Sequence, residues 1–461
     1  MKSCLKNYCF LRLLPTFSFL LSIQVTAQTF TVLHDFDGSG GGGPVAALTI
    51  SSNTIYGTTF GGGASNLGTV FKINTDGTGF TNLHSFNGNI NLPFNANTDG
   101  AYPQGGLLLV GNTLYGTTAF GGTNGNGTVF ALRVDGTDFT NLHLFNGTDG
   151  AEPYGGRLVV GNSTLYGTTS GGGVSNGGTV FTLSTDGTGF TSLHNFNSGE
   201  YPFSGLLLSS NILYGTTSVG ANGTVFALHT DGSGFTNLHK FNGSSDGAHP
   251  QCDLILLGNT LYGTAYSGAN NNGGTVFALN IDGTGFRTLH TFTLGFDGGR
   301  PSSGLTSLGA RLYGVGNQGG SGGNGTVFAL TSDGTDFSTL HSFSALYPSL
   351  GDYTNVGGAS PYGALTVSGD HLYGTCAAGG IFGNDGTVFS ISLQPQLAIG
   401  SVNGNFVLTW LTNFSAFTLQ STTNLASPVW TTNLPAPVIV NGQYTVTNPI
   451  TGTQQFFRLS Q

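Results

Sequence analysis

The sequence has few charged residues, few cysteines and no long apolar run beyond its N-terminal segment. Charged residues make up 7% of the 461 positions, and only four cysteines occur. Cys252 and Cys376 are the two that lie outside the first nine residues, so the chain has one possible disulfide there and depends on a packed core. No later run approaches the ~20 apolar residues of a membrane helix. We therefore expect no membrane span.

The first 27 residues have the pattern of a secretory signal. Lys2, Lys6 and Arg12 are the early charges, the run "LLPTFSFLLSIQV" is apolar, and the small-residue sequence "VTA" precedes Gln28. We predict that residues 1–27 are a signal peptide and that the mature chain is secreted or held at the extracellular surface.

The charge that remains is acidic. Beyond residue 27 the chain has 8 basic and 20 acidic residues, a net charge of −12. Nucleic acid is therefore excluded as an expected partner, because phosphate binding depends on clustered Lys and Arg. Glycine is abundant, at 79 residues, but aromatic residues at 11% indicate a folded core rather than a disordered polymer.

Three short words recur seven times along the chain. The first, "[LI]YG", recurs at intervals of 48 to 60 residues; its tyrosines are Tyr56, Tyr115, Tyr166, Tyr214, Tyr262, Tyr313 and Tyr373. The words "GTVF" and "LHxF" follow in the same order. A period near 50 residues predicts one small sheet per repeat.

Each repeat contains four short apolar runs, a to d, separated by turn residues. In the third repeat they are "GRLVVG", "STLYGTT", "GTVFTLS" and "GFTSLHNF". The a–b link is "GN" or "SN" and the c–d link is "TDGTG", both typical of tight hairpins. Successive apolar positions within the runs indicate strands that are covered on both faces. The repeat thus predicts a four-stranded antiparallel blade.

The last repeat lacks a fourth strand, and the N-terminal end of the repeat region has one to spare. The "DG[TS]" turn between strands c and d occurs in six repeats, and the seventh repeat stops after "GTVFSISL". The chain, however, begins with an extra fourth strand, "TFTVLHDF". A closed ring accounts for both features, whereas an open solenoid would leave two exposed edges. We predict that residues 28–395 form an all-β, seven-bladed β-propeller in which the N-terminal strand completes the last blade.

The unit "LYGTTxxGGxxxxGTVFxLxxDGTGFTxLHxF" resembles the tandem repeat of the GloVer (Gloeo/Verruco) family of exported bacterial proteins. The resemblance covers nearly the whole repeat region. It implies export and a repeat architecture, and it brings no activity, catalytic residue or cofactor. Kelch-type propellers are a more distant likeness, through repeat length and glycine pairs.

Residues 396–461 differ in composition from the repeats. They contain both tryptophans of the chain, Trp410 and Trp430, and one charged side chain, Arg458. Short β-type runs broken by Asn, Pro and Gly predict a small β-sandwich of immunoglobulin or fibronectin type III character. We expect both tryptophans in its core, with sugar stacking as the alternative.

The repeated polar and aromatic residues are interpreted as structural. The "LHxF" histidines occur once per blade, so in a ring they point to seven different places; they are expected to tie the outer strand to its neighbours. The "LYG" tyrosines are expected to pack in the core, and the single proline before each strand a is expected to be a rigid turn. We expect neither a metal nor a cofactor.

Two d–a connections, residues 87–103 and 344–361, are longer than the others. Long irregular loops on a rigid scaffold often carry binding residues. The predicted binding contacts in these loops are Phe94, Tyr102, Tyr347, Asp352 and Tyr353.

Few carboxylates lie outside the repeat words, namely Glu152, Glu200, Asp253, Asp352 and Asp385. Glu152 and Glu200 precede strand a in neighbouring blades and are expected to lie close enough to act as a catalytic pair. Our leading hypothesis is nevertheless an exported, monomeric, non-catalytic binding or scaffolding protein whose propeller face binds a glycan or a cell-surface protein. The alternative is an extracellular carbohydrate-active enzyme, a glycoside hydrolase or lyase, that uses Glu152 and Glu200.

Overall fold

The protein is all-β throughout the residues described by its computed structural model. These are residues 4–5, 8–12, 29–88, 97–154, 156–220, 222–349, 352–382, 384–393, 397–402, 405–411, 418–424, 428–432, 434–440, 443–449 and 454–460. Their one helical segment is a 3₁₀ turn at Asn270–Asn272, and none of their helices could cross a membrane. The chain divides into two compact units: Phe30–Ile391, and Met1–Thr29 together with Ser392–Gln461.

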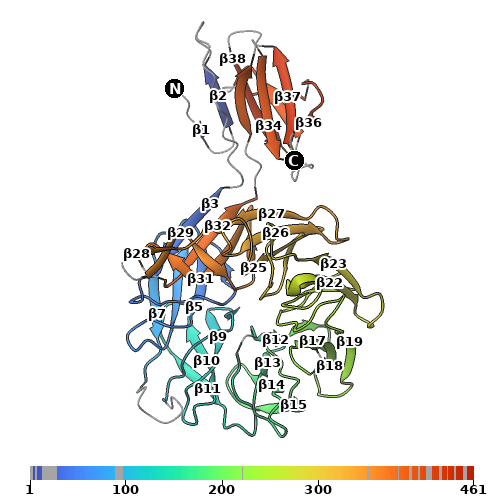
Figure 1. Ribbon diagram of the computed structural model, residues 1–461. Helices are drawn as coiled ribbons and strands as arrows, with labels where there is room; N and C mark the ends of the chain where they lie inside the picture. The colour runs from blue at the N-terminus through green and yellow to red at the C-terminus, as the bar shows by residue number, and fades with distance from the viewer. Residues whose placement is uncertain are drawn as a thin grey trace. The chain divides into compact units, whose positions relative to one another are not determined.

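The first unit contains six four-stranded antiparallel sheets with the strands in sequence order. Sheet 1 is β4 (Thr49–Ser51), β5 (Thr54–Thr59), β6 (Thr69–Asn74) and β7 (Thr81–Ser85); sheet 2 is β8 (Leu108–Val110), β9 (Thr113–Thr118), β10 (Thr128–Arg133) and β11 (Thr140–Leu144); sheet 3 is β12 (Val159–Gly161), β13 (Thr164–Thr169), β14 (Thr179–Ser184) and β15 (Thr191–Asn195). Sheet 4 is β16 (Leu207–Ser209), β17 (Ile212–Thr217), β18 (Thr224–His229) and β19 (Thr236–Lys240); sheet 5 is β20 (Ile255–Leu257), β21 (Thr260–Ala265), β22 (Thr275–Asn280) and β23 (Arg287–Thr291); sheet 6 is β24 (Thr306–Leu308), β25 (Arg311–Gly316), β26 (Thr326–Thr331) and β27 (Ser338–Ser342). Figure 1 shows the sheets following one another around a common centre.

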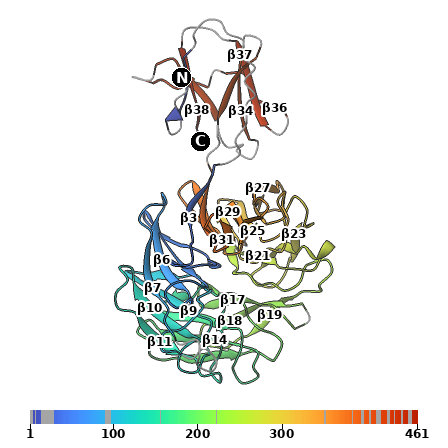
Figure 2. The same cartoon turned by 60° about the vertical axis from the view of Figure 1, so that its left-hand side comes forward.

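Sheet 7 has six strands and combines both ends of this unit. Its strands are β28 (Tyr347–Ser349), β29 (Asp352–Pro361), β30 (Thr366–Ser368), β31 (His371–Gly380), β32 (Thr387–Ser392) and, from the N-terminal side, β3 (Phe30–Asp35). β3 pairs antiparallel with β32, and the two run side by side in both views (Figures 1 and 2). The expected irregular loop at 344–361 is instead largely a hairpin, because β28 pairs with β29 and β29 extends the sheet along β31.

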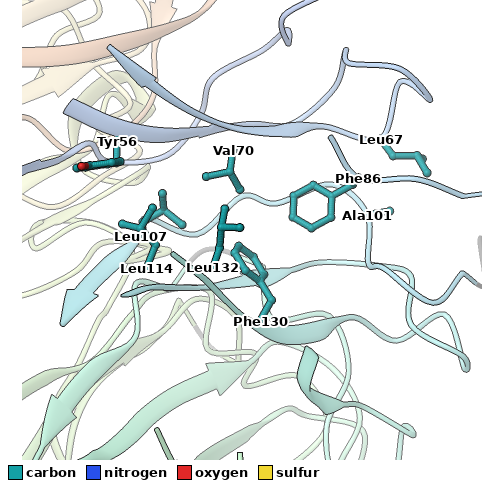
Figure 3. Packing of buried hydrophobic residues seen from close by; sticks show 9 residues of the cluster. All are labelled: Tyr56, Leu67, Val70, Phe86, Ala101, Leu107, Leu114, Phe130 and Leu132. Carbon is teal, nitrogen blue, oxygen red and sulfur yellow. The ribbon is translucent and has the colours of Figure 1, made fainter. Parts of the chain in front are cut away.

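The repeat words form the cores between neighbouring sheets. Between sheets 1 and 2 the buried cluster contains the "LYG" tyrosine Tyr56, the "GTVF" residues Val70 and Phe130, and the "LHxF" phenylalanine Phe86 (Figure 3). The glycine of "LYG" is required because a Cβ on Gly116 would lie 2.5 Å from Cζ of Phe130 in the paired strand. Both faces of each sheet are thus covered, as the uninterrupted apolar runs predicted.

Every sheet is joined to the next by one recurring aromatic contact. Each "LHxF" histidine stacks on a phenylalanine of the following sheet, with ring centroids 3.7 to 3.9 Å apart. Sheet 6 uses the N-terminal strand for this contact, because His341 stacks on Phe30 of β3. Sheet 7 continues to sheet 1 through His34 and Phe80, and the Thr366 hydroxyl donates to the Leu48 carbonyl at 2.7 Å. The seven histidines therefore have the structural role expected of them.

The second unit consists of two four-stranded sheets. One is β33 (Ala398–Val402), β34 (Asn405–Leu411), β37 (Gln443–Pro449) and β36 (Val438–Val440); the other is β1 (Cys4–Leu5), β2 (Tyr8–Arg12), β38 (Gln454–Ser460) and β35 (Thr418–Thr422). Their shared core includes Trp410, whereas Trp430 is half-exposed with Arg458 over its ring at 4.3 Å. The expectation that both tryptophans are buried was thus wrong for Trp430.

Candidate functional site

The prolines that precede the inner strands position the main candidate site, a cavity of about 310 Å³. Its described lining residues all lie within three positions after one of these prolines, and all seven sheets contribute. They are Val45, Ala46, Ala47, Gln104, Gly106, Tyr154, Phe203, Gln251, Asp253, Ser302, Ser303, Gly304, Tyr362, Gly363 and Ala364. A cavity with a wall from every sheet lies at the centre of the ring, and we call it the axial cavity.

Packing against the preceding sheet fixes each of the seven prolines. A Cβ on the glycine of the preceding "GTVF" word would lie 2.5 to 2.9 Å from the proline Cδ, so only glycine leaves room. The contact recurs around the ring and includes Gly386 of sheet 7 with Pro44 of sheet 1. The prolines are thus rigid anchors, as expected, and they hold the residues next to them in place.

The residue directly after each proline lines the axial cavity and differs from sheet to sheet. These residues are Val45, Gln104, Tyr154, Phe203, Gln251, Ser302 and Tyr362. Three are aromatic and three carry neutral hydrogen-bonding groups. Such a combination suits neutral polar ligands with apolar faces.

The residue directly before each proline has a positive φ in all seven sheets. These residues are Gly43, Tyr102, Glu152, Tyr201, His249, Arg300 and Ser360, with φ between 41° and 62°. The conformation is uncommon for non-glycine residues and costs ~1–2 kcal/mol at each. Backbone hydrogen bonds to the preceding sheet hold it, as from the Glu152 amide to the Asn126 carbonyl at 2.9 Å. Six strained non-glycine residues beside the axial cavity are typical of a functional surface.

Aromatic side chains continue from the cavity across sheets 1 to 4. Successive ring centroids are 4.8 to 6.4 Å apart. The chain of rings, which we call the aromatic arc, is Phe60, Tyr102, Phe120, Tyr154, Phe203 and Tyr201. Tyr154 and Phe203 belong both to the arc and to the cavity lining. The arc and the cavity therefore form one continuous surface.

Two opposite charges, Asp253 and Arg157, occupy a repeat position that holds a small residue in the other sheets, and Asp253 is the one of the two that lines the cavity. The equivalent positions in the other five sheets are occupied by Ala47, Gly106, Gly205, Gly304 and Ala364. Asp253 and Arg157 lie on either side of sheet 4, and the Gly205 amide donates to Asp253 Oδ1 at 2.7 Å. Burial raises the pKa of Asp253, while the Gly205 hydrogen bond and the Arg157 charge oppose that rise. The hydroxyl of the neighbouring Ser303 is buried without a hydrogen-bond partner.

The glycine-rich b–c loops are held by their own hydrogen bonds. In sheet 3 the Gly172 amide donates to the side-chain oxygen of Asn176 at 3.0 Å, and Gly172 and Gly173 have φ of 68° and 75°. These loops bring no basic side chain to bind an anion. Among the described residues no cluster of three or more His, Cys, Asp or Glu could hold a metal ion.

The structure separates the predicted binding residues. Tyr102 belongs to the aromatic arc, stacked on Phe60 at 4.8 Å. Tyr347 is exposed on β28, and Asp352 and Tyr353 lie on β29. Phe94 is outside the described residues. Tyr102 is thus the predicted binding residue that the described rings place in the aromatic arc.

Glu152 and Glu200, the expected pair, occupy different positions of the repeat. Glu152 precedes its proline directly, but Glu200 precedes its proline by two residues. Glu200 makes the contact of the repeat aspartate: it accepts from the Asn197 amide at 2.8 Å, as Asp149 does from the Asn146 amide at 2.9 Å. Burial raises the pKa of Glu152. The two carboxylates are therefore not equivalent, and neither is among the described residues that line the axial cavity.

Sequence reasoning missed the residues that line the axial cavity. In the words "DGAYP", "DGAEP", "DGAHP" and "DGGRP" the sequence predicts a rigid proline turn, with Tyr102 and Glu152 as the candidate site residues, and it gives no role to the residues after the proline. The useful signal was variation inside a repeated word: the residues on either side of the proline change from repeat to repeat while the proline remains. Asp253 was noted as a carboxylate outside the repeat words, but its convergence with the other sheets is not visible in the sequence.

Comparison with known proteins supports the repeat assignment. A family described as the Gloeobacter/Verrucomicrobia repeat matches residues 18–222 and 218–403. No protein of curated function is significantly similar in sequence.

Solved structures resemble the chain in fold. The GH74 enzyme of Niastella koreensis is 15% identical, with a TM-score of 0.51; the match covers 88% of this chain and 60% of the enzyme. Oligogalacturonate lyase from Vibrio parahaemolyticus is 8% identical, with a TM-score of 0.50, covering 80% of this chain and 98% of the lyase. The chain thus spans less than two thirds of the Niastella enzyme. At these identities the likeness concerns the propeller-like fold alone.

Proposed function

The chain belongs to the Gloeobacter/Verrucomicrobia repeat family, and from this membership and the axial cavity we propose that it is an exported, monomeric, non-catalytic glycan-binding protein. Residues 28–395 form a seven-bladed β-propeller, and residues 396–461 form a small sandwich of immunoglobulin or fibronectin type III character. The propeller face with the axial cavity and the aromatic arc carries the ligand.

Sheet composition supports the seven-bladed ring. Each of the seven repeat sheets contains an a–d meander, and in sheet 7 the fourth strand is β3 from the N-terminal side. The last histidine stack and the threonine hydrogen bond from sheet 7 to sheet 1 support closure without an open edge. Within residues 396–461, the sheet β33–β34–β37–β36 and the strand pair β38–β35 share the core around Trp410 and support the sandwich.

Continuity between the aromatic arc and the axial cavity is the observation that carries the binding proposal. Aromatic faces stack on the apolar faces of sugar rings, while amide and hydroxyl groups such as those of Gln104 and Ser302 exchange hydrogen bonds with sugar hydroxyls. The acidic net charge favours an uncharged glycan over an anionic one. A cell-surface protein is the alternative ligand.

The small number of carboxylates at the axial cavity favours binding over hydrolysis. Most glycoside hydrolases use two carboxyl groups on either side of the scissile bond. Asp253 is the one carboxylate among the described residues that line the axial cavity.

We expect Tyr154→Ala and Phe203→Ala each to weaken glycan binding by about tenfold or more, because central aromatic residues dominate binding energy at such surfaces. A glycan array identifies bound glycans, and calorimetry of wild type and variants then gives the affinities. Phe296→Ala, at a ring that is 80% exposed and outside the cavity, is the control and should retain wild-type affinity.

A hydrolysis assay on the same glycans separates binding from catalysis. Product release by the wild type that Glu152→Gln abolishes would overturn the non-catalytic proposal. Retention of a surface protein with no glycan bound would favour the alternative ligand.

The N-terminus of the recovered protein tests the proposed export. The protein recovered from the culture medium or cell surface of a producing bacterium should begin at Gln28, because residues 1–27 have the features of a cleaved signal. Mass spectrometry of its N-terminal peptide measures this. Recovery of an intact N-terminus from the cytoplasm alone would contradict export.

A further inference from the structure

The axial cavity has the shape of a pit rather than a groove. All seven sheets contribute to its wall, and its described lining ends at the third residue after each proline. At about 310 Å³ it is at the small end of the ~300–1,000 Å³ of small-ligand sites. A groove lets a polymer enter and leave along the surface, whereas a pit with walls on every side admits a terminal group.

The deepest described lining of the pit carries one charged group, Asp253. Its Oδ1 accepts from the Gly205 amide at 2.7 Å. The backbone of the next sheet lies against it, because a Cβ on Gly304 would be 2.4 Å from the Asp253 carbonyl oxygen. The Thr264 hydroxyl donates to the Ser303 carbonyl at 2.8 Å and holds this backbone, while the Ser303 hydroxyl is enclosed by the protein.

The mouth of the pit differs in chemistry from its floor. Tyr154 and Phe203 lie 6.0 Å apart in neighbouring sheets, and the other arc rings continue outward from them. A ligand that extends from the floor along the arc would thus meet hydrogen-bonding groups at one end and aromatic faces along its length.

We propose that the axial cavity binds the terminal sugar of an uncharged glycan end-on, with Asp253 and Gln104 contacting its hydroxyls and the aromatic arc supporting the sugars that follow. This inference rests on the proposed glycan binding and adds the part of the glycan that is recognised. The number of protein molecules that bind is then set by the number of glycan chain ends and not by the length of each chain.

The stoichiometry of binding tests end-on recognition. The probes are short and long members of neutral glucan, xylan, mannan and galactan oligosaccharide series, chosen from those bound on the array. We expect the number of protein molecules per glycan chain, measured by calorimetry and sedimentation, to be independent of chain length. Chemical modification of the recognised terminal sugar should weaken binding by about tenfold or more.

Variants at the floor and wall of the pit test the named contacts. Asp253→Asn and Gln104→Ala should each weaken binding of the short oligosaccharide by about tenfold. Asp135→Asn, in an exposed c–d turn, is the matched control and should bind as wild type does. Because Asp253→Asn leaves Arg157 without its opposite charge, thermal unfolding of each variant is measured alongside, and Gln104→Ala keeps the test valid if Asp253→Asn does not fold.

The outcomes distinguish the two proposals. Stoichiometry that rises with chain length, or floor and wall variants with wild-type affinity, would overturn end-on recognition and leave glycan binding intact. Absence of binding to every probe series and to every glycan on the array would overturn the proposed function and this inference together.

Discussion

Deletion of residues 28–37 is expected to abolish cooperative unfolding of the repeat unit. The deletion removes β3, which pairs with β32, together with two phenylalanines of the ring core. Phe36 is fully buried and packs edge-on against Phe71, while Phe30 stacks on His341 and Phe389. Loss of the buried Phe36 costs ~3–5 kcal/mol, and loss of the half-buried Phe30 and of the β3–β32 pairing adds to this cost, against the 5–15 kcal/mol stability of a typical protein.

Thermal unfolding followed by circular dichroism measures the effect of this deletion. Deletion of residues 1–27 alone is the control and should leave unfolding of the repeat unit unchanged. The point variant Phe30→Ala should lower stability by ~3 kcal/mol in a chain that still folds. If the chain without residues 28–37 melts as the wild type does, the closing role of β3 is disproved.

The second large effect is expected on acidification. Burial between Phe30 and Phe343 lowers the pKa of His341 to about 4, from 6.5 in the unfolded chain. Between these values the unfolded chain holds a proton that the folded chain does not, so stability falls as pH drops through this range. The loss is complete near pH 4 and amounts to ~3 kcal/mol for this residue.

His341→Phe tests this prediction because it retains an aromatic ring and cannot titrate. Urea unfolding between pH 7.5 and pH 4 should show an acid loss smaller by ~3 kcal/mol in His341→Phe than in the wild type. Burial also lowers the pKa values of His34, His143, His194 and His290, so part of the slope should remain. Identical profiles for His341→Phe and the wild type would refute the assignment.

Strands and turns could be predicted from the sequence because their causes are local. The alternation of apolar runs with "GN" and "TDGTG" turns specifies hairpins within about ten residues of chain, and the repeat count indicated that β3 belongs with the last sheet. The structure of the second long connection was harder to predict, because nothing within residues 344–361 alone favours a hairpin added to sheet 7. Its pairing depends on β31, which lies later in the chain.

The candidate site was less predictable than the fold. The rule that a residue before proline is extended would assign ordinary backbone to Tyr102, Glu152 and Arg300. All three have positive φ because their amides donate to the preceding sheet, a contact that exists only after the sheets have packed.

By itself the sequence determined the repeat, its strands and turns, and the phenylalanine, tyrosine and glycine positions that pack neighbouring sheets. These follow from periodicity and from steric limits that act within one repeat. The tertiary structure decided what the variable residues do: it brought Tyr154, Phe203 and Asp253 to one cavity. The physical reason is that these residues are about 50 to 100 positions apart in the chain and meet only through the rotation from each sheet to the next.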